Sequence, residues 1–201
     1  MKHLVIFSHP NPKSFSHAIL KEFSGVLLGQ GNEVKVRDLY EIGFNPVLSA
    51  KDFEAIFAGK VQSDVKEEQD LVSWADVITF IYPIWWTGLP AIVKGYIDRV
   101  FSYGFAYEST KNGIVGKLSS KRVVILTPMG TPRQVYQERG MLVAMEQTMD
   151  VGIFKFCGIQ NITHHFFGGV TSCSNEEREK MLMDIRLVAR QLTGEVNDIY
   201  L

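Results

Sequence analysis

Cysteine is scarce in this sequence. The chain of 201 residues contains two, Cys157 and Cys173, and they stand in neither a CxxC pair nor a metal-ligand spacing. This excludes a disulfide-stapled scaffold and a zinc site built on cysteine. Free thiols in a reducing cytosol are the expectation.

An excess of positive charge and long apolar runs are missing too. The formal net charge is −1, so no basic stripe can follow a phosphate backbone, and we expect no nucleic-acid partner. No apolar stretch approaches the ~20 residues of a membrane span, and the opening MKHLVIFS is too short for a signal peptide. We therefore expect a cytoplasmic protein without membrane insertion. A hydrophobic content of 46% favours one full core, and we take 1–201 as a single domain.

Buried-strand patterns instead alternate with helical ones. Continuous apolar or alternating runs predict five strands, at His3–Ser8, Glu33–Asp38, Asp76–Tyr82, Arg122–Thr127 and Asn161–Phe167. Helices are predicted between and after them, at Phe15–Leu28, within 51–75, and at Pro90–Phe101, Gly140–Phe156 and Ser174–Leu192, the last with a capping box and a stop at Gly194. This alternation indicates an α/β fold with a parallel sheet covered by helices on both faces. Ligands of such sheets bind beyond the carboxyl ends of the strands, so the loops there are the candidate site.

The first of these loops is SHPNPKSFSHA, Ser8–Ala18. It contains neither GxGxxG nor GxxxxGK[ST], which argues against those two nucleotide-binding motifs. His9, Ser14 and Ser16 stand there with the free N–H groups of a helix start, a combination that suits one phosphate. Equally, Ser14 or Ser16 could serve only to cap the helix.

The loop after the third strand, PIWWTG, carries two adjacent tryptophans, Trp85 and Trp86. They could wall a flat conjugated ring, or they could pack over sheet edges or a subunit interface. The loop after the fourth strand adds Gly130, for close backbone approach, and Tyr136 as a polar aromatic. Phosphate, aromatic and glycine loops together favour a mononucleotide with a flat ring, a flavin.

Several charged and histidine residues receive simpler interpretations. His164 and His165 alternate on a strand, so one is expected to point inward and one outward, with no metal between them. The run Lys66–Glu68 is interpreted as an exposed helix face, and Asp98 with Arg99 as a surface pair at a helix end.

Three segments resemble the flavodoxin-like NAD(P)H:quinone oxidoreductases. They are the SHPNPKSFSHA loop, PIWWTGLPAIVKGYIDRVF and the following GFAY, Gly104–Tyr107. That family includes mammalian quinone reductases, bacterial general-stress oxidoreductases and the ancillary oxidoreductases of potassium-efflux systems. The resemblance extends across nearly the whole chain. It implies the strand order 2-1-3-4-5, a tightly bound flavin, NAD(P)H as co-substrate, and a homodimer with its active sites at the interface.

The resemblance also assigns residues. The phosphate-side positions of the family correspond to His9, Ser14, Phe15 and Ser16. The loop along one edge of the flavin ring corresponds to Pro83, Ile84, Trp85, Trp86 and Thr87. The loop on the other side corresponds to Thr127, Gly130 and Tyr136, and the aromatic offered by the partner subunit to Tyr107. Tyr136 and Tyr107 are thus the candidate catalytic residues.

Two departures from the family pattern matter. Mammalian members have a histidine six residues after the tyrosine, where this chain has Leu142, so the tyrosine–histidine relay is incomplete. The stretch Ala50–Ala75 is shorter than the mammalian insertion that helps hold adenine, which favours FMN, with FAD second. The expected activity is two-electron, ping-pong transfer from NAD(P)H through FMN to a quinone or similar aromatic acceptor. The alternatives are a regulatory flavoprotein subunit of a potassium-efflux transporter and a one-electron carrier like flavodoxin.

Overall fold

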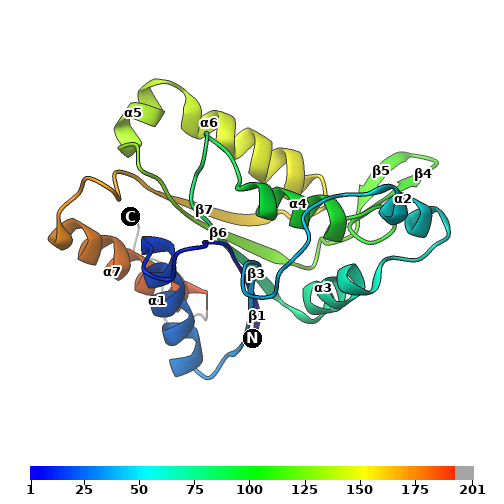
Figure 1. Ribbon diagram of the computed structural model, residues 1–201, viewed down its shortest axis with the longest axis horizontal. Helices are drawn as coiled ribbons and strands as arrows, with labels where there is room; N and C mark the ends of the chain where they lie inside the picture. The colour runs from blue at the N-terminus through cyan, green and yellow to red at the C-terminus, as the bar shows by residue number, and fades with distance from the viewer. Residues whose placement is uncertain (193–201) are drawn as a thin grey trace.

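The computed structural model describes residues 1–192, and its centre is a five-stranded parallel sheet (Figure 1). The strand order is β2-β1-β3-β6-β7, which confirms the predicted order 2-1-3-4-5 of the parallel strands. The strands are β1 (Lys2–Phe7), β2 (Glu33–Asp38), β3 (Val77–Ile81), β6 (Arg122–Pro128) and β7 (Asn161–Phe167).

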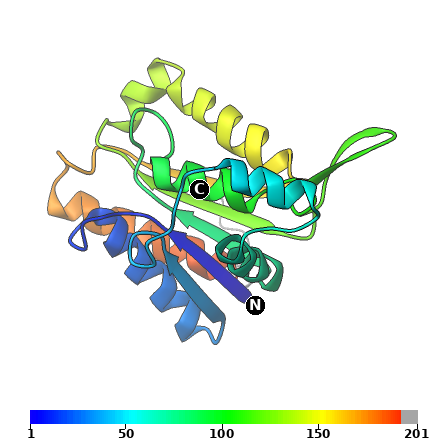
Figure 2. The same ribbon diagram turned by 45° about the vertical axis from the view of Figure 1, so that its right-hand side comes forward.

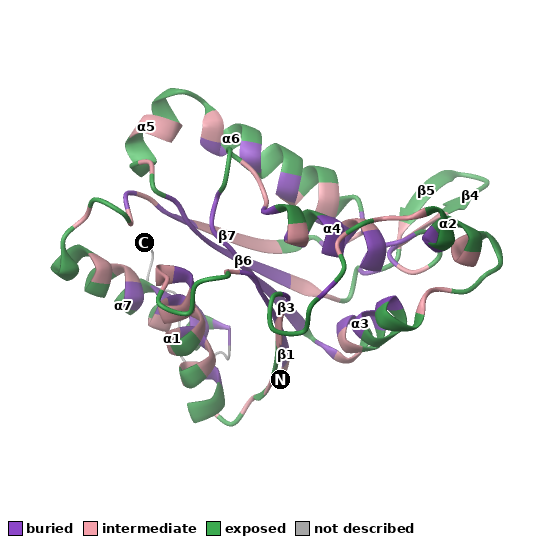
Figure 3. Ribbon diagram, in the orientation of Figure 1, coloured by how far each residue is buried: buried purple, intermediate pink, exposed green. Residues whose placement is uncertain are grey.

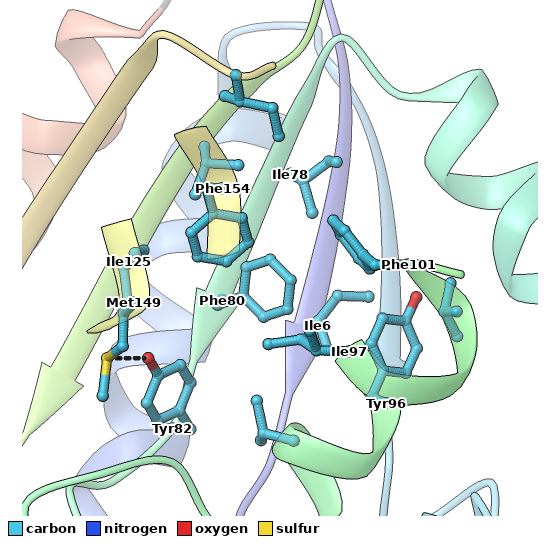
Figure 4. Close-up of a cluster of buried hydrophobic side chains, with 14 of the residues drawn as sticks. Ile6, Ile78, Phe80, Tyr82, Tyr96, Ile97, Phe101, Ile125, Met149 and Phe154 are labelled. Carbon is cyan, nitrogen blue, oxygen red and sulfur yellow. Dashed lines mark hydrogen bonds between the residues drawn. The ribbon is translucent and has the colours of Figure 1, made fainter. Parts of the chain in front are cut away.

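Helices cover both faces of this sheet, as predicted. One face carries α1 (Phe15–Gly29) and α7 (Asn175–Gln191), and the other carries α3 (Ser63–Trp74), α4 (Ala91–Val100), α6 (Met141–Glu146) and the π-helix η1 (Gln147–Lys155). Strand β1 shows why both faces of the sheet are covered. Val5 and Phe7 are buried against the first layer, while Leu4 and Ile6 are buried against the second. Side chains alternate along a strand, so a strand covered on both faces must be apolar throughout. Figures 2 and 3 show this two-sided core, and Figure 4 shows the part beneath α4 and η1.

Some elements differ from the prediction. The stretch 51–75, where one or two short helices are predicted, holds two, α2 (Ala50–Phe57) and α3. The predicted helix at Gly140–Phe156 is α-helical only to Glu146 and continues as η1. The sequence pattern does not reveal α5 (Arg133–Glu138) or the β4–β5 hairpin (Tyr107–Thr110, Gly113–Gly116), which projects from the sheet in Figure 2. Both are too short to show a hydrophobic period.

The capping box of α7 is confirmed. The Ser174 hydroxyl accepts from the Glu177 N–H at 3.2 Å, and the Glu177 carboxylate accepts from the Ser174 N–H at 2.7 Å. The predicted stop at Gly194 lies outside the described residues.

Two charged side chains predicted on the surface are buried, so those interpretations were wrong. Glu68 accepts from Arg37 Nε at 2.8 Å and from the Tyr96 hydroxyl at 3.2 Å. Arg99 donates to the carboxylates of Asp52 and Asp64 and ties α4 to α2 and α3. A buried charge needs a partner, and these partners come from strand β2 and from other helices, where no local pattern reveals them.

His3 gives a prediction about acid stability. The residue lies within β1 and is fully buried, and neither ring nitrogen makes a hydrogen bond of good geometry, although the Asn32 side chain is close by. Burial above all, and then the nearby N-terminal ammonium, lower the pKa of His3 from 6.5 to about 4. Because the folded chain binds the proton less readily than the unfolded chain, the contribution of His3 to stability is complete above pH 6.5 and is lost towards pH 4. We expect the contribution of His3 to the free energy of unfolding to fall by about 2–3 kcal/mol between pH 7 and pH 4.5.

Urea unfolding of the wild type and of His3→Leu at both pH values measures this cost. All other titrating groups are shared, so their contributions cancel in the comparison. The wild type should lose more stability on acidification than the variant by the stated amount. Equal losses in the two proteins would refute a buried neutral histidine.

Candidate flavin site

The loops at the carboxyl ends of β1, β3, β6 and β7 meet around a pocket of about 500 Å³. This volume lies within the usual range of small-molecule sites. The lining residues are His9, Asn11, Ser14, Phe15, Ser16, Pro83, Ile84, Trp85, Pro128, Met129, Gly130, Val170 and Thr171. Of the residues predicted to bind the cofactor, the structure thus brings together all except Trp86, Thr87 and Thr127.

One side of the pocket is the start of α1. Ser14 is its N-cap, and the Ser14 hydroxyl accepts from the His17 N–H at 3.3 Å. The first N–H groups of a helix have no partner within it, and the helix dipole makes this end positive. Asn11 tightens the preceding loop, because its side chain accepts from the Lys13 N–H at 2.9 Å and its carbonyl from the Ser14 N–H at 3.1 Å. The arrangement is suited to an anion such as a phosphate.

His9 adds a donor to the same side. Its Nδ1 accepts from the Asn11 N–H at 3.0 Å, so the neutral ring carries its proton on Nε2. Burial lowers the pKa of His9, which keeps the ring neutral at pH 7. The ring lies edge-on to Trp85, with the centroids 6.0 Å apart. His9 therefore links the anion end of the pocket to its aromatic wall.

The aromatic wall sits on a strained two-residue turn. Trp85 and Gly88 exchange backbone hydrogen bonds of 3.2 and 3.1 Å, and the two residues between them both have positive φ, 51° at Trp86 and 56° at Thr87. This is the geometry of a type I′ turn, which favours Asn and Gly, and a β-branched residue with positive φ is an outlier. Strain of this kind gathers at ligand clamps. Trp85 faces the pocket, whereas the Trp86 side chain is fully exposed.

The remaining predicted residues lie elsewhere. The Thr127 side chain is buried within the fold, where it contacts His164 and the carbonyl of His165. Tyr136 lies on α5, half-buried against the core. Tyr107 lies on β4 and lines a second, apolar pocket of about 670 Å³ with Tyr103 and Phe156. The structure does not bring Tyr107 into the first pocket of its own chain.

Sequence reasoning missed five pocket residues, namely Asn11, Pro128, Met129, Val170 and Thr171. Three of them, Asn11, Pro128 and Met129, lie within the loops that the sequence identifies. Val170 and Thr171 follow the fifth parallel strand, and the rule that ligands sit beyond the carboxyl ends of strands could have found them.

The features of the pocket suit a phosphate and a flat aromatic group. Among the helices within 1–192, none has the length and apolarity to cross a membrane. In the same part of the chain, no three His, Cys, Asp or Glu side chains are grouped to hold a metal ion.

Comparison with known proteins agrees with this geometry. Residues 1–191 match the model of a family described by the flavodoxin-like fold. An uncharacterized NAD(P)H oxidoreductase of Haemophilus influenzae is 38% identical over 183 residues, covering 90% of this chain and 91% of that protein. The ribosyldihydronicotinamide dehydrogenase (quinone) of Mus musculus is 30% identical over 201 residues, with 90% and 87% covered.

A solved structure shows the same relationship. The NAD(P)H:quinone oxidoreductase from Methanothermobacter marburgensis superposes with a TM-score of 0.88 at 32% identity, and the match covers 96% of this chain and 98% of that one. The fold, the pocket and these relatives lead to one conclusion: the chain belongs to the family of flavodoxin-like NAD(P)H:quinone oxidoreductases.

Proposed function

We propose that this protein binds FMN and transfers two electrons from NAD(P)H to a quinone or a similar aromatic acceptor. The observation that carries the proposal is one pocket that joins an anion-binding helix start to an aromatic loop. When bound, the flavin would supply the redox chemistry, namely hydride acceptance from NAD(P)H and two-electron reduction of the acceptor in a ping-pong cycle.

The chain's own groups would hold the cofactor. The first N–H groups of α1, the hydroxyls of Ser14 and Ser16 and the Nε2–H of His9 would bind the phosphate. The backbone of Trp85–Thr87 would lie along one edge of the ring, and Gly130 opposite. Donors on this edge stabilise negative charge on a reduced ring. The two loops are joined by the hydrogen bond from the Ile84 N–H to the Pro128 carbonyl, 2.9 Å long, which fixes their separation.

FMN fits this chain better than FAD. The pocket has one anion-binding helix start, at α1. In the segment where the resembling mammalian proteins hold adenine, Asp52 and Asp64 are both engaged by Arg99. They hold α2 and α3 to the body of the fold rather than facing a ligand.

The direct test is to release and identify the flavin of the purified protein, and then to follow reduction of the reloaded flavin by NADH and NADPH separately. We expect FMN, its reduction by at least one of the two, and reoxidation by a quinone without an accumulated semiquinone. A protein that binds no flavin refutes the proposal. A stable blue semiquinone, with no reduction by either nucleotide, supports a one-electron carrier.

We propose a cytoplasmic homodimer whose partner subunits complete each site. Two exposed aromatics support this arrangement, Trp86 with its side chain fully exposed and Phe57 at 86%. The apolar pocket that contains Tyr107 lies beside Phe57. An apolar pocket lined by exposed aromatic side chains is the kind of surface that marks an interaction site. A second copy would cover it and place its Tyr107 near the Trp86 of the first.

Subunit complementation tests this arrangement. We expect Trp86→Ala and Tyr107→Ala each to be nearly inactive as homodimers. In a mixed dimer one site would collect both changes and the other neither, so up to about half of its sites should work. Activity is assayed after mixing, with subunit exchange followed by mass spectrometry. Exchange without recovered activity would mean that both residues serve the same chain's site.

A further inference from the structure

A chain of hydrogen bonds runs behind the pocket, from η1 to β6. Asp150 Oδ1 lies 2.9 Å from His164 Nδ1, and His164 Nε2 lies 3.2 Å from Thr127 Oγ1. The Thr127 hydroxyl donates to the His165 carbonyl at 3.1 Å. The His164 side chain is 3% exposed, and its ring stacks on Phe166 with the centroids 3.9 Å apart. The ring of His164 is thus held at both nitrogens and on one face.

The chemistry of these groups gives the series of hydrogen bonds a direction. A carboxylate can only accept, so His164 donates from Nδ1 to Asp150, and Nε2 faces Thr127. The Thr127 hydroxyl has one proton and can also accept: it accepts from Nε2 when that nitrogen carries a proton, and otherwise shares its own proton between Nε2 and the His165 carbonyl. Thr127 is fully buried, and the contacts of its hydroxyl lie within the fold. Its side chain therefore does not face the pocket. The three residues that follow it, Pro128–Gly130, do line the pocket.

The same helix also supports the other flavin loop. The Tyr82 hydroxyl donates to the sulfur of Met149 at 3.1 Å, as Figure 4 shows, and Tyr82 directly precedes Pro83 of the pocket. Met149 and Asp150 are consecutive residues of η1. Helices of the π type are rare, and those that do occur are frequently found at functional sites. This one contacts Tyr82 directly, and it reaches Thr127, the residue before the pocket on β6, through His164 of β7.

We propose that His164 is a positioning residue for the flavin: held by Asp150, it fixes Thr127 and thereby sets Pro128–Gly130 against the cofactor. The proposal rests on the proposed FMN site. It assigns the Thr127 side chain to support of the loop rather than to contact with the cofactor. The simpler alternative is that the chain only satisfies a buried histidine and joins β6 to β7. The two differ in outcome, because only the first requires flavin affinity to depend on the hydrogen bonds.

The experiment measures FMN dissociation constants and thermal midpoints of flavin-free protein. Thr127→Val replaces the hydroxyl by a methyl group, and His164→Phe keeps an aromatic ring that can stack on Phe166. We expect each to raise the dissociation constant about tenfold, and the double variant to raise it about tenfold as well, because both changes break one chain. Thr127→Ser, which retains the hydroxyl, should stay within about twofold of the wild type.

The matched control is His165→Phe, the same change one residue along. The His165 side chain points to the opposite face of the sheet, towards α7, whose Asp184 acts on it electrostatically. Its FMN affinity should match the wild type.

Variants with lowered thermal midpoints but unchanged FMN affinity would overturn the proposal, as would additive effects in the double variant. If His164→Phe does not fold, Thr127→Val against Thr127→Ser decides alone. A wild type that binds no FMN would refute the proposed function itself.

Discussion

Replacing Ser14 by aspartate should raise the FMN dissociation constant by at least about 100-fold, about 2.7 kcal/mol, without harming the fold. Aspartate caps helices as well as serine does, and its charge suits the positive end of α1. We therefore expect the free energy of unfolding of flavin-free protein to change by less than about 0.5 kcal/mol. The carboxylate, however, would stand where the proposed function places the phosphate. Two like charges about 4 Å apart repel by about 4 kcal/mol near a protein surface.

Fluorescence titration of flavin-free protein with FMN measures this effect, and two controls isolate the phosphate. Riboflavin lacks the phosphate, so its affinity should be the same for the wild type and Ser14→Asp. Ser174→Asp makes the same substitution at the N-cap of α7, where Ser174 accepts from the Glu177 N–H, and should leave FMN affinity unchanged. If Ser14→Asp bound FMN as tightly as the wild type, Ser14 would be only a helix cap and the phosphate would lie elsewhere.

Arg99→Met should destabilise the protein by about 3–5 kcal/mol at pH 7. The Arg99 side chain is 4% exposed and donates to Asp52 at 3.0 and 2.9 Å, to Asp64 at 2.6 Å and to the Asn45 carbonyl at 2.9 Å. Methionine fills similar space but leaves the buried Asp52 carboxylate without its cation. The loss arises from that uncompensated charge.

Urea unfolding of three variants tests the Arg99 prediction. Arg186→Met removes a solvent-screened pair with Glu22 and should destabilise the protein far less than Arg99→Met does. Asp52→Asn combined with Arg99→Met removes the orphaned charge and should recover part of the loss. We call the group of Arg99 with Asp52 and Asp64 the Arg99 clasp. If Arg99→Met lowered the free energy of unfolding no more than Arg186→Met does, a stabilising buried clasp would be contradicted.

Acidification provides a further check on the clasp. Burial pushes the pKa of Asp52 upward, but hydrogen bonds from Ser49 and Arg99 outweigh it and hold this pKa below its usual range. The clasp's contribution is thus present at neutral pH and is lost as the pH falls through the folded-state pKa. The stability difference between the wild type and Arg99→Met should shrink accordingly.

The sequence by itself determined the layered α/β fold and the location of the site. Apolar runs such as Val77–Ile81 and the helical period of Phe15–Gly29 repeat within a few residues, so they can be recognised without knowledge of the fold. Parallel strands then leave their carboxyl ends at one edge, which placed the Ser14 loop, the Trp85 loop and Gly130 together. The capping box at Ser174 is local for the same reason.

Tertiary structure alone decided which side chains face the pocket and which support it. Trp85 and Trp86 are adjacent and chemically alike, yet the turn at Trp86–Thr87 directs Trp85 to the pocket and Trp86 to the surface. The hydroxyl of Thr127 turns to His164, which is 37 residues away, and Arg99 is buried because Asp52 meets it from 47 residues away. Orientation and burial depend on partners brought by other elements, and those distant partners leave no mark in the local sequence pattern.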